Sequence, residues 1–201
     1  MSIVPLHRIR ASFDARTIRV YQAYREEIAE VALANGTFLS PPFSMSRMTW
    51  IKPSFLWMMY RAGWGFKDAG QARILGIDIT REGFEWALAH GCLSHRDPSL
   101  TDEEWTWFKK QHPVRIQWDP ERDLQLRPLP HSSLQMGLEC EALERYCGSW
   151  IVAIEDKTAL AHEMRGLVDA GKLQEAEKLL PVEEVYPIDR PELLLLLRDV
   201  R

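Results

Sequence analysis

The stretch from Arg47 to Gly65 (RMTWIKPSFLWMMYRAGWG) combines cationic, hydroxyl and aromatic side chains in a pattern that suits anion binding. Its polar residues precede or open a helix that is predicted to begin at Pro53; they are Arg47, Thr49, Lys52 and Ser54. A helix amino terminus carries unpaired N–H groups and a partial positive charge, and basic neighbours strengthen its attraction for anions. We expect Lys52, Ser54 and Arg47 to hold a phosphate or a carboxylate there.

The same helix is aromatic along one face and apolar around most of its circumference. The residues at helical spacing on that face are Trp57, Tyr60, Arg61 and Trp64. A helix that is apolar nearly all round is typical of a buried central element. The aromatic face is therefore either part of the core or a surface for ligand stacking, and the sequence leaves both open.

Two further segments offer polar side chains in apolar surroundings. Arg115, Gln117 and Asp119 alternate with apolar residues, which predicts one polar face on a strand; in a functional interpretation Arg115 and Gln117 form the floor of a cleft. Gln135 and Gln22 are interior amides that need partners, and pockets are one place where such groups occur. The alternative to a cleft floor is an ordinary half-exposed strand. The alternative for Asp119 is a local contact with Arg122 across a tight turn.

Several catalytic signatures are absent from the sequence. It contains no glycine-rich phosphate loop, no GxSxG, no HExxH and no CxxC. The six histidines are scattered without metal-ligand spacing; His95, beside Ser94 and Asp97, is a candidate base or a surface histidine. We expect no metal site and neither serine nor cysteine hydrolase chemistry.

The composition predicts a soluble globular protein. The chain has 201 residues, a net charge of -4 and 46% hydrophobic residues, which suits one domain, 1–201, with a core of about 9–187. No apolar run approaches the length that spans a bilayer, so we expect no membrane association. Three cysteines, an odd number, favour reduced thiols and a cytoplasmic location. The oligomeric state is left open.

Charge is distributed unevenly along the chain. Met1 to Leu75 carries ten basic and five acidic residues, whereas the remainder carries 15 basic and 24 acidic residues. The basic part attracts a phosphate-bearing ligand, or the two parts face one another in the fold.

The pattern of elements predicts a mixed α+β domain with small mixed or antiparallel sheets. Strands are expected at 17–24, 72–79, 114–118, 124–126 and 150–154, with 132–138 ambiguous between strand and helix. Helices are expected at 25–35, from Pro53 to about 62, at 81–90, from a capping box at Thr101 and Glu104 through Phe108, and at 139–147, 158–170, 173–180 and 191–199. The tryptophan-rich helix is central in this arrangement, and the last helices form a carboxy-terminal layer. Strands and helices are interspersed without the rhythm of a doubly wound sheet.

Four segments in this order, TIRVYQAY, RMTWIKPSFLWMMYRAGWG, VRIQWDPERDL and SLQMGL, resemble the uncharacterised family known as domain of unknown function 4291. The resemblance runs from about Ile9 to Pro187. It implies no established activity.

More remotely, a first strand followed by a helix that closes on Asn35 to Phe38 is similar to the opening of the ADP-ribosyltransferase-like fold. That resemblance implies NAD in a cleft between two small sheets. In that fold a residue of the first strand, a residue of the second strand and a late Glu or Gln contact NAD. By position, Gln22 would correspond to the first of these residues, Ser54 or Thr49 to the second, and Gln135 to the last. It leaves transfer chemistry without a carboxylate, because Gln135 is an amide.

Three hypotheses about function follow. In the first, the chain is an enzyme of ADP-ribosyltransferase type that uses NAD or a related nucleotide. Its catalytic residues are Gln135 and Gln22, and its cofactor-binding residues are Arg47, Thr49, Trp50, Lys52, Ser54, Tyr24, Arg115 and Gln117, with Trp50 or Tyr24 stacking on a base. In the second, the basic and aromatic residues bind a nucleotide or a nucleic acid without catalysis. In the third, the acidic carboxy-terminal helices mediate contact with another protein.

Overall fold

The computed structural model describes residues 7–95 and 99–188 of the chain. Short strands, most of them paired antiparallel, are interspersed with helices, so the domain belongs to the predicted α+β class. The strands are β1 (Arg10–Ala11), β2 (Thr17–Tyr24), β3 (Thr49–Ile51), β4 (Arg73–Thr80), β5 (Gly91–Leu93), β6 (Val114–Arg122), β7 (Pro128–Leu138), β8 (Ile151–Asp156) and β9 (Glu184–Val185). The helices are α1 (Glu26–Asn35), α2 (Phe55–Ala62), α3 (Arg81–Ala89), α4 (Asp102–Lys110), α5 (Cys140–Arg145), α6 (Thr158–Asp169) and α7 (Leu173–Glu177), with short turns η1 (Gly63–Gly65), η2 (Ala69–Gln71) and η3 (Tyr146–Trp150).

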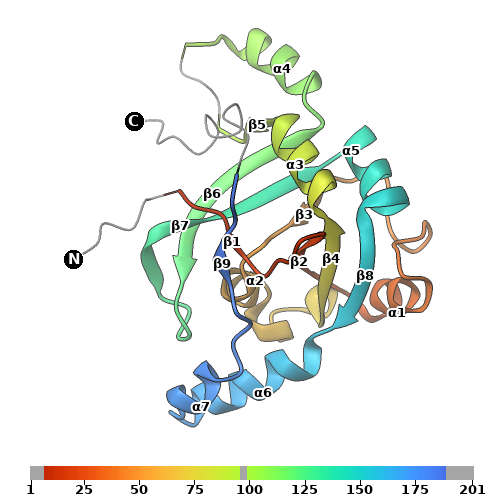
Figure 1. Ribbon diagram of the computed structural model, residues 1–201. Helices are drawn as coiled ribbons and strands as arrows, with labels where there is room; N and C mark the ends of the chain where they lie inside the picture. Colours follow the sequence, from red (N-terminus) through yellow and green to blue (C-terminus); the bar gives the residue numbers. More distant parts are fainter. Residues whose placement is uncertain (1–6, 96–98, 189–201) are drawn as a thin grey trace.

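The strands form three small sheets. An antiparallel sheet has the order β2–β4–β8, and a mixed sheet has the order β3–β7–β6–β5, in which β5 and β6 run parallel. The short pair β1–β9 joins the two ends of the described chain, and Figure 1 shows the long β6–β7 pair beside the β2–β4–β8 sheet. The two larger sheets are joined where the Tyr21 N–H donates to the carbonyl oxygen of Lys52 at 2.7 Å. This bond places the residues after β3 next to the second half of β2.

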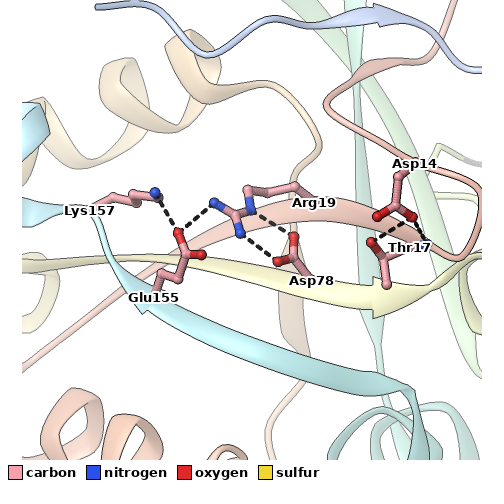
Figure 2. Close-up of polar contacts among 6 residues, drawn as sticks. All are labelled: Asp14, Thr17, Arg19, Asp78, Glu155 and Lys157. Atoms are coloured by element: carbon pink, nitrogen blue, oxygen red, sulfur yellow. Dashed lines mark hydrogen bonds and ion pairs between the residues drawn. The ribbon is translucent and has the colours of Figure 1, made fainter.

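The alternation of β2 is confirmed and gives its two faces different environments. Ile18 and Val20 are fully buried in the main core. On the opposite face, the Arg19 guanidinium donates to Asp78 of β4 and to Glu155 of β8, at 2.7 and 2.8 Å, so the network crosses all three strands (Figure 2). Hydrogen bonds from Arg19 and from a neighbouring lysine lower the pKa of Glu155 to about 2. By the same alternation, even-numbered residues at the end of β2 face away from this network.

Local signals in the sequence set the ends of several helices as predicted. α1 ends at Gly36, which has a left-handed φ of 68°. The Thr80 hydroxyl accepts a hydrogen bond from the Gly83 N–H at the start of α3. Thr101 and Glu104 form the predicted capping box of α4. These contacts involve residues at most three positions apart, which is why the sequence alone reveals them.

The tryptophan-rich helix α2 is largely buried, but it begins later than expected. Ser54 is its N-cap and accepts a hydrogen bond from the Trp57 N–H at 3.1 Å, so Pro53 precedes the helix. Five of its eight residues are buried, whereas Tyr60 is 43% exposed. The helix is therefore central to the fold with one edge at the surface.

The connection between β6 and β7 differs from the prediction. β6 continues through Asp119–Arg122, which was expected to be a turn, and Leu124–Leu126, which was expected to be a strand, is the actual turn. The Asp123 carboxylate accepts hydrogen bonds from the N–H groups of Gln125 and Arg127 and closes this turn. The ambiguous segment 132–138 belongs to β7.

The predicted carboxy-terminal helical layer is present in α6 and α7, at the lower end of the molecule in Figure 1. Ala161 and Met164 of α6 are fully buried against the cluster that contains α2. The further helix expected at 191–199 lies outside the described residues. No helix of the described chain is long and apolar enough to cross a bilayer.

Candidate functional site

A cleft of about 860 Å³ lies where β2 of one sheet meets β3, β6 and β7 of the other. The structure brings together in it eight of the ten residues that the sequence singles out: Gln22, Tyr24, Arg47, Thr49, Trp50, Lys52, Gln117 and Gln135. The volume is within the range of about 300 to 1,000 Å³ that is typical of small-molecule sites. Ser54 and Arg115 do not line it.

Gln22 lies on the cleft wall but is fully engaged by the protein. Its side-chain oxygen accepts a hydrogen bond from the Tyr146 hydroxyl at 2.7 Å. Its nitrogen donates to the Trp50 carbonyl oxygen at 3.1 Å and to the Tyr24 hydroxyl at 3.0 Å, and Tyr24 in turn is 2.7 Å from the Thr49 hydroxyl. Gln22 is 3% exposed, so its amide ties β2 to β3 and to η3 and positions the wall. The hydrogen bonds of Gln22 in this structure all go to the protein, and its expected catalytic role stays a prediction.

A carboxylate that the sequence analysis did not include among the site residues lies opposite this wall. Asp119 accepts hydrogen bonds from the Gln117 amide, at 3.1 and 3.2 Å, and from the Gln135 amide. Gln117 and Gln135 are direct partners in the β6–β7 register, which explains why both amides reach the same carboxylate. The sequence signal was the continued period-two spacing from Gln117 to Asp119, and the turn predicted after Trp118 concealed it.

Lys52 is a buried basic residue in the cleft. The residue is 6% exposed. Its Nζ donates to the Trp50 carbonyl oxygen at 3.1 Å and lies 5.6 Å from the centre of the Trp57 ring. Burial, reinforced by the charge of Arg61, lowers the pKa of Lys52 to about 7, and the charge of Asp119 opposes this shift. Near neutral pH a large fraction of the Lys52 side chains is therefore an uncharged amine.

The indole of Trp50 lies over Gly137, its direct partner on β7. A Cβ at position 137 would lie 3.0 Å from the Trp50 ring and 2.5 Å from the Met48 sulfur. The absence of a side chain at Gly137 thus gives the indole room to lie against the strand at the cleft wall. Tyr24 and Phe43 contribute further aromatic surface, with ring centres 5.9 Å apart.

The cations of the cleft outnumber its acids. Its basic lining residues are Arg25, Arg47, Lys52 and Arg61, and Asp119 is the acidic residue that lines it. Arg47 is exposed, and no hydrogen bond or ion pair links it to another residue of the described ranges. Its charge is therefore available to an anion that enters the cleft.

The amino terminus of α2 does not serve as the anion site that the sequence suggested. The Phe55 N–H donates to a carboxylate oxygen of Glu183 at 2.7 Å, and the Ser54 hydroxyl donates to Glu121 at 2.9 Å. Burial and the proximity of Glu121 raise the pKa of Glu183 to about 8. The chain itself supplies a carboxyl group for this helix end, and the Ser54 hydroxyl caps the helix.

Arg115 is also structural. It starts the polar face of β6, but its guanidinium donates to the Glu139 carboxylate at 2.7 Å and to the Lys109 carbonyl oxygen at 3.0 Å. Four residues separate it from Asp119, or about 13 Å of extended strand. Arg115 therefore joins the end of α4 to the start of α5 and takes no part in the cleft.

Other candidate chemistry lies away from the cleft. His95 is exposed and its Nδ1 is 3.3 Å from the Ser94 hydroxyl, outside the residues that line the cleft. Among residues 7–95 and 99–188 no cluster of three histidine, cysteine, aspartate or glutamate side chains is arranged to hold a metal ion. The cleft is thus the place where the sequence-derived candidates converge.

Comparison with known protein families shows to which family the chain belongs. The sequence profile described as Domain of unknown function (DUF4291) matches residues 8–186, which include every residue of the cleft. The chain belongs to this family. No curated protein gives a match to the DUF4291 chain. The family resemblance seen in the sequence is confirmed, and the chemistry of the DUF4291 domain has to be argued from its cleft.

Proposed function

We propose that the DUF4291 domain is a nucleotide-binding enzyme of ADP-ribosyltransferase type that takes NAD into the cleft between its two larger sheets. The observation that carries the proposal is the Asp119 carboxylate. Two amides hold it in a cleft that also offers aromatic surface and unpaired cations. In a reaction whose transition state carries positive charge on a sugar, a carboxylate held beside the substrate stabilises that charge.

The residues of the cleft fit the parts of a dinucleotide. Arg47 and Arg61 can neutralise a pyrophosphate at the exposed rim, where neither forms an ion pair with a carboxylate in the described ranges. Trp50 and Tyr24 provide flat surfaces, and stacking of a base on such a ring contributes about 1–3 kcal/mol. The phosphates are assigned to side chains, because Glu183 already occupies the amino terminus of α2.

Asp119 supplies the charge that Gln135 lacks. NAD carries an ADP-ribosyl group joined to a leaving group, and breaking that bond places positive charge on the ribose. Asp119 stabilises this charge, and the amides of Gln117 and Gln135 keep its oxygens in one orientation. Gln135 is then a positioning residue, and the catalytic assignment moves from it to the neighbouring strand.

A non-catalytic nucleotide or nucleic-acid binder is the second candidate, and the cations at the cleft rim favour it. Binding that follows a phosphate backbone weakens steeply as salt concentration rises, whereas a dinucleotide with two phosphates is less sensitive. The two candidate functions also predict different effects of the Asp119 charge, because it repels a phosphate backbone but assists group transfer.

The experiment combines binding and turnover on the purified chain. Calorimetric titrations with NAD, ADP-ribose, ATP and single-stranded RNA are run at two salt concentrations, and nicotinamide release from NAD is followed by chromatography. We expect Arg47→Ala to weaken NAD binding about tenfold, the equivalent of about 1.4 kcal/mol. Arg165→Ala is the matched control, because Arg165 pairs with Asp169 on α6, away from the cleft.

Asp119→Asn separates catalysis from binding. The amide keeps the shape of the carboxylate but removes its charge, so we expect NAD binding to persist and nicotinamide release to fall by about 100-fold or more. Binding of RNA alone, lost at high salt, favours the non-catalytic candidate. No binding of any of these ligands contradicts both and leaves contact with another protein as the function to test.

A further inference from the structure

The Lys52 amine has fewer partners than its burial requires. An ammonium group has three N–H donors. In the described ranges one hydrogen bond, to the Trp50 carbonyl oxygen, engages Nζ, and no carboxylate lies within ion-pair distance of it. Ninety-four per cent of the residue is shielded from solvent, yet it lines the cleft. A buried ammonium in this position is costly unless it loses its proton or meets a ligand.

The surroundings of Lys52 favour the uncharged amine. Burial and the charge of Arg61 lower the pKa of Lys52 to about 7, and Asp119 opposes this effect only in part. The face of the Trp57 ring, 5.6 Å from Nζ, attracts an ammonium only weakly and offers it no hydrogen-bond acceptor. An uncharged amine has a free lone pair and is a nucleophile at neutral pH.

We propose that the Lys52 amine forms a reversible imine with the carbonyl group of an anionic aldehyde or ketone that binds in the cleft.

The reaction needs no oxidant or reductant. The nitrogen lone pair of Lys52 attacks the carbonyl carbon, and a proton moves from nitrogen to the carbonyl oxygen to give a carbinolamine. That hydroxyl group then leaves as water with a proton from solvent, while nitrogen loses its second proton to solvent and forms the C=N bond. The carbonyl oxygen ends in water, so the balance is one imine and one water from one amine and one carbonyl compound.

The local structure tolerates the loss of the amine hydrogens. The Trp50 carbonyl oxygen, which accepts a hydrogen bond from Lys52, also accepts one from Gln22 at 3.1 Å. It therefore stays satisfied when the nitrogen of Lys52 becomes part of an imine.

The charge of the cleft defines the class of carbonyl compound. Arg47 is exposed at the cleft and has no carboxylate partner in the described ranges, and Arg61 donates to the neutral side chain of Gln71. A phosphate or carboxylate on the carbonyl compound pairs with these cations and holds the carbonyl group near Lys52. Neutral aldehydes lack this attachment and bind more weakly.

This inference uses the cleft but does not rest on NAD as the ligand. The test uses pyridoxal 5′-phosphate, which carries an aldehyde and a phosphate, and pyridoxal, which carries the aldehyde alone. Each is incubated with the purified chain at pH 7, the imine is reduced with cyanoborohydride, and the labelled lysines are identified by peptide mass spectrometry. A chain that fails to bind NAD still gives a clear result with these probes.

We expect one label per chain at Lys52 with pyridoxal 5′-phosphate, at about tenfold lower probe concentration than with pyridoxal. Arg47→Ala is expected to remove that tenfold preference, and Lys178→Met, which changes an exposed lysine on the far end of the chain, is expected to leave it unchanged. Lys52→Arg keeps a cation in the cleft but cannot form an imine, so its label falls to background.

Two results overturn the proposal. One is labelling confined to exposed lysines, with Lys52 unmodified in the wild-type peptide map, which needs no variant to fold. The other is equal labelling of Lys52 by pyridoxal 5′-phosphate and by pyridoxal, which contradicts the inference that the carbonyl compound is anionic.

Discussion

Replacement of Lys52 by methionine tests the electrostatics of the cleft directly. Methionine fills a similar volume and is never charged, so the variant removes only what the amine contributes. The Trp50 carbonyl oxygen keeps its hydrogen bond from Gln22, and no buried acceptor is left without a partner. The change in stability therefore reports mainly on the protonation of Lys52.

The magnitude follows from the lowered pKa. The ordinary pKa of a lysine is 10.5 and that of Lys52 in the folded chain is about 7, so between these values only the unfolded chain carries the proton. In that interval each pH unit adds about 1.4 kcal/mol to the free energy of unfolding of the wild type. Water in the open cleft reduces the effect, and we expect a total gain of about 2 to 4 kcal/mol between pH 7 and pH 10.5.

The assay is urea unfolding followed by the fluorescence of the eight tryptophans, at pH 6, 7, 8, 9 and 10. We expect the free-energy difference between Lys52→Met and the wild type to favour the variant most at pH 6 and to decline steadily above pH 7. Lys178→Met, an exposed control, is expected to show no such trend. A flat difference for Lys52→Met across the whole range would refute the inference that Lys52 is desolvated.

Three further substitutions test the elements that position the cleft. Glu183→Gln keeps an acceptor for the Phe55 N–H but cannot ionise. Because the pKa of Glu183 is about 8, we expect the free energy of unfolding of the wild type to fall from about pH 4.5 to pH 8. In urea unfolding at pH 8 we expect the variant to be more stable than the wild type by about 2–4 kcal/mol. Gly137→Ala brings a Cβ to 3.0 Å from the Trp50 ring, and we expect a loss of about 1–3 kcal/mol in stability together with a changed tryptophan emission spectrum. Arg19→Met leaves the acidic groups of β4 and β8 without their shared partner, and a loss of about 2 kcal/mol in urea unfolding at pH 7 is expected, which declines as these groups become protonated at low pH.

The parts of the fold that the sequence predicted are those that neighbouring residues determine. The alternation of β2 and the capping box at Thr101 act within a few positions, and both were confirmed. The predicted position of the turn between β6 and β7 was wrong: Pro120, Glu121 and Arg122 have turn-like composition, but Pro120 and Arg122 are paired with β7 and Glu121 lies in the irregularity between them. Pairing with a partner strand overrides local preference here.

The site was predicted in outline because its residues stand out locally as polar groups among apolar ones. Eight of them converge on one cleft, but their roles depend on contacts between distant positions that the sequence does not reveal. Gln22 bonds to Tyr146, 124 positions away, and Glu183 reaches Phe55 across 128 positions. The first contact engages the amide of Gln22, and the second places a carboxyl group of the chain where the sequence predicted an anionic ligand.

The ion pairs of the structure bear out one of the two interpretations of the uneven charge, and the attraction of a phosphate-bearing ligand stays a prediction. Arg19 and Arg73, from the basic part of Met1 to Leu75, pair with acidic residues of β4 and β8, so the two parts do face one another. Arg47 and Lys52 belong to the same basic part but find no carboxylate in the described ranges, and both lie in the cleft. Folding thus pairs Arg19 and Arg73 with acids, whereas Arg47 and Lys52 in the cleft have no such partner in the described ranges. This remaining charge is the physical reason for proposing an anionic ligand, bound by ion pairs alone or also through the Lys52 amine.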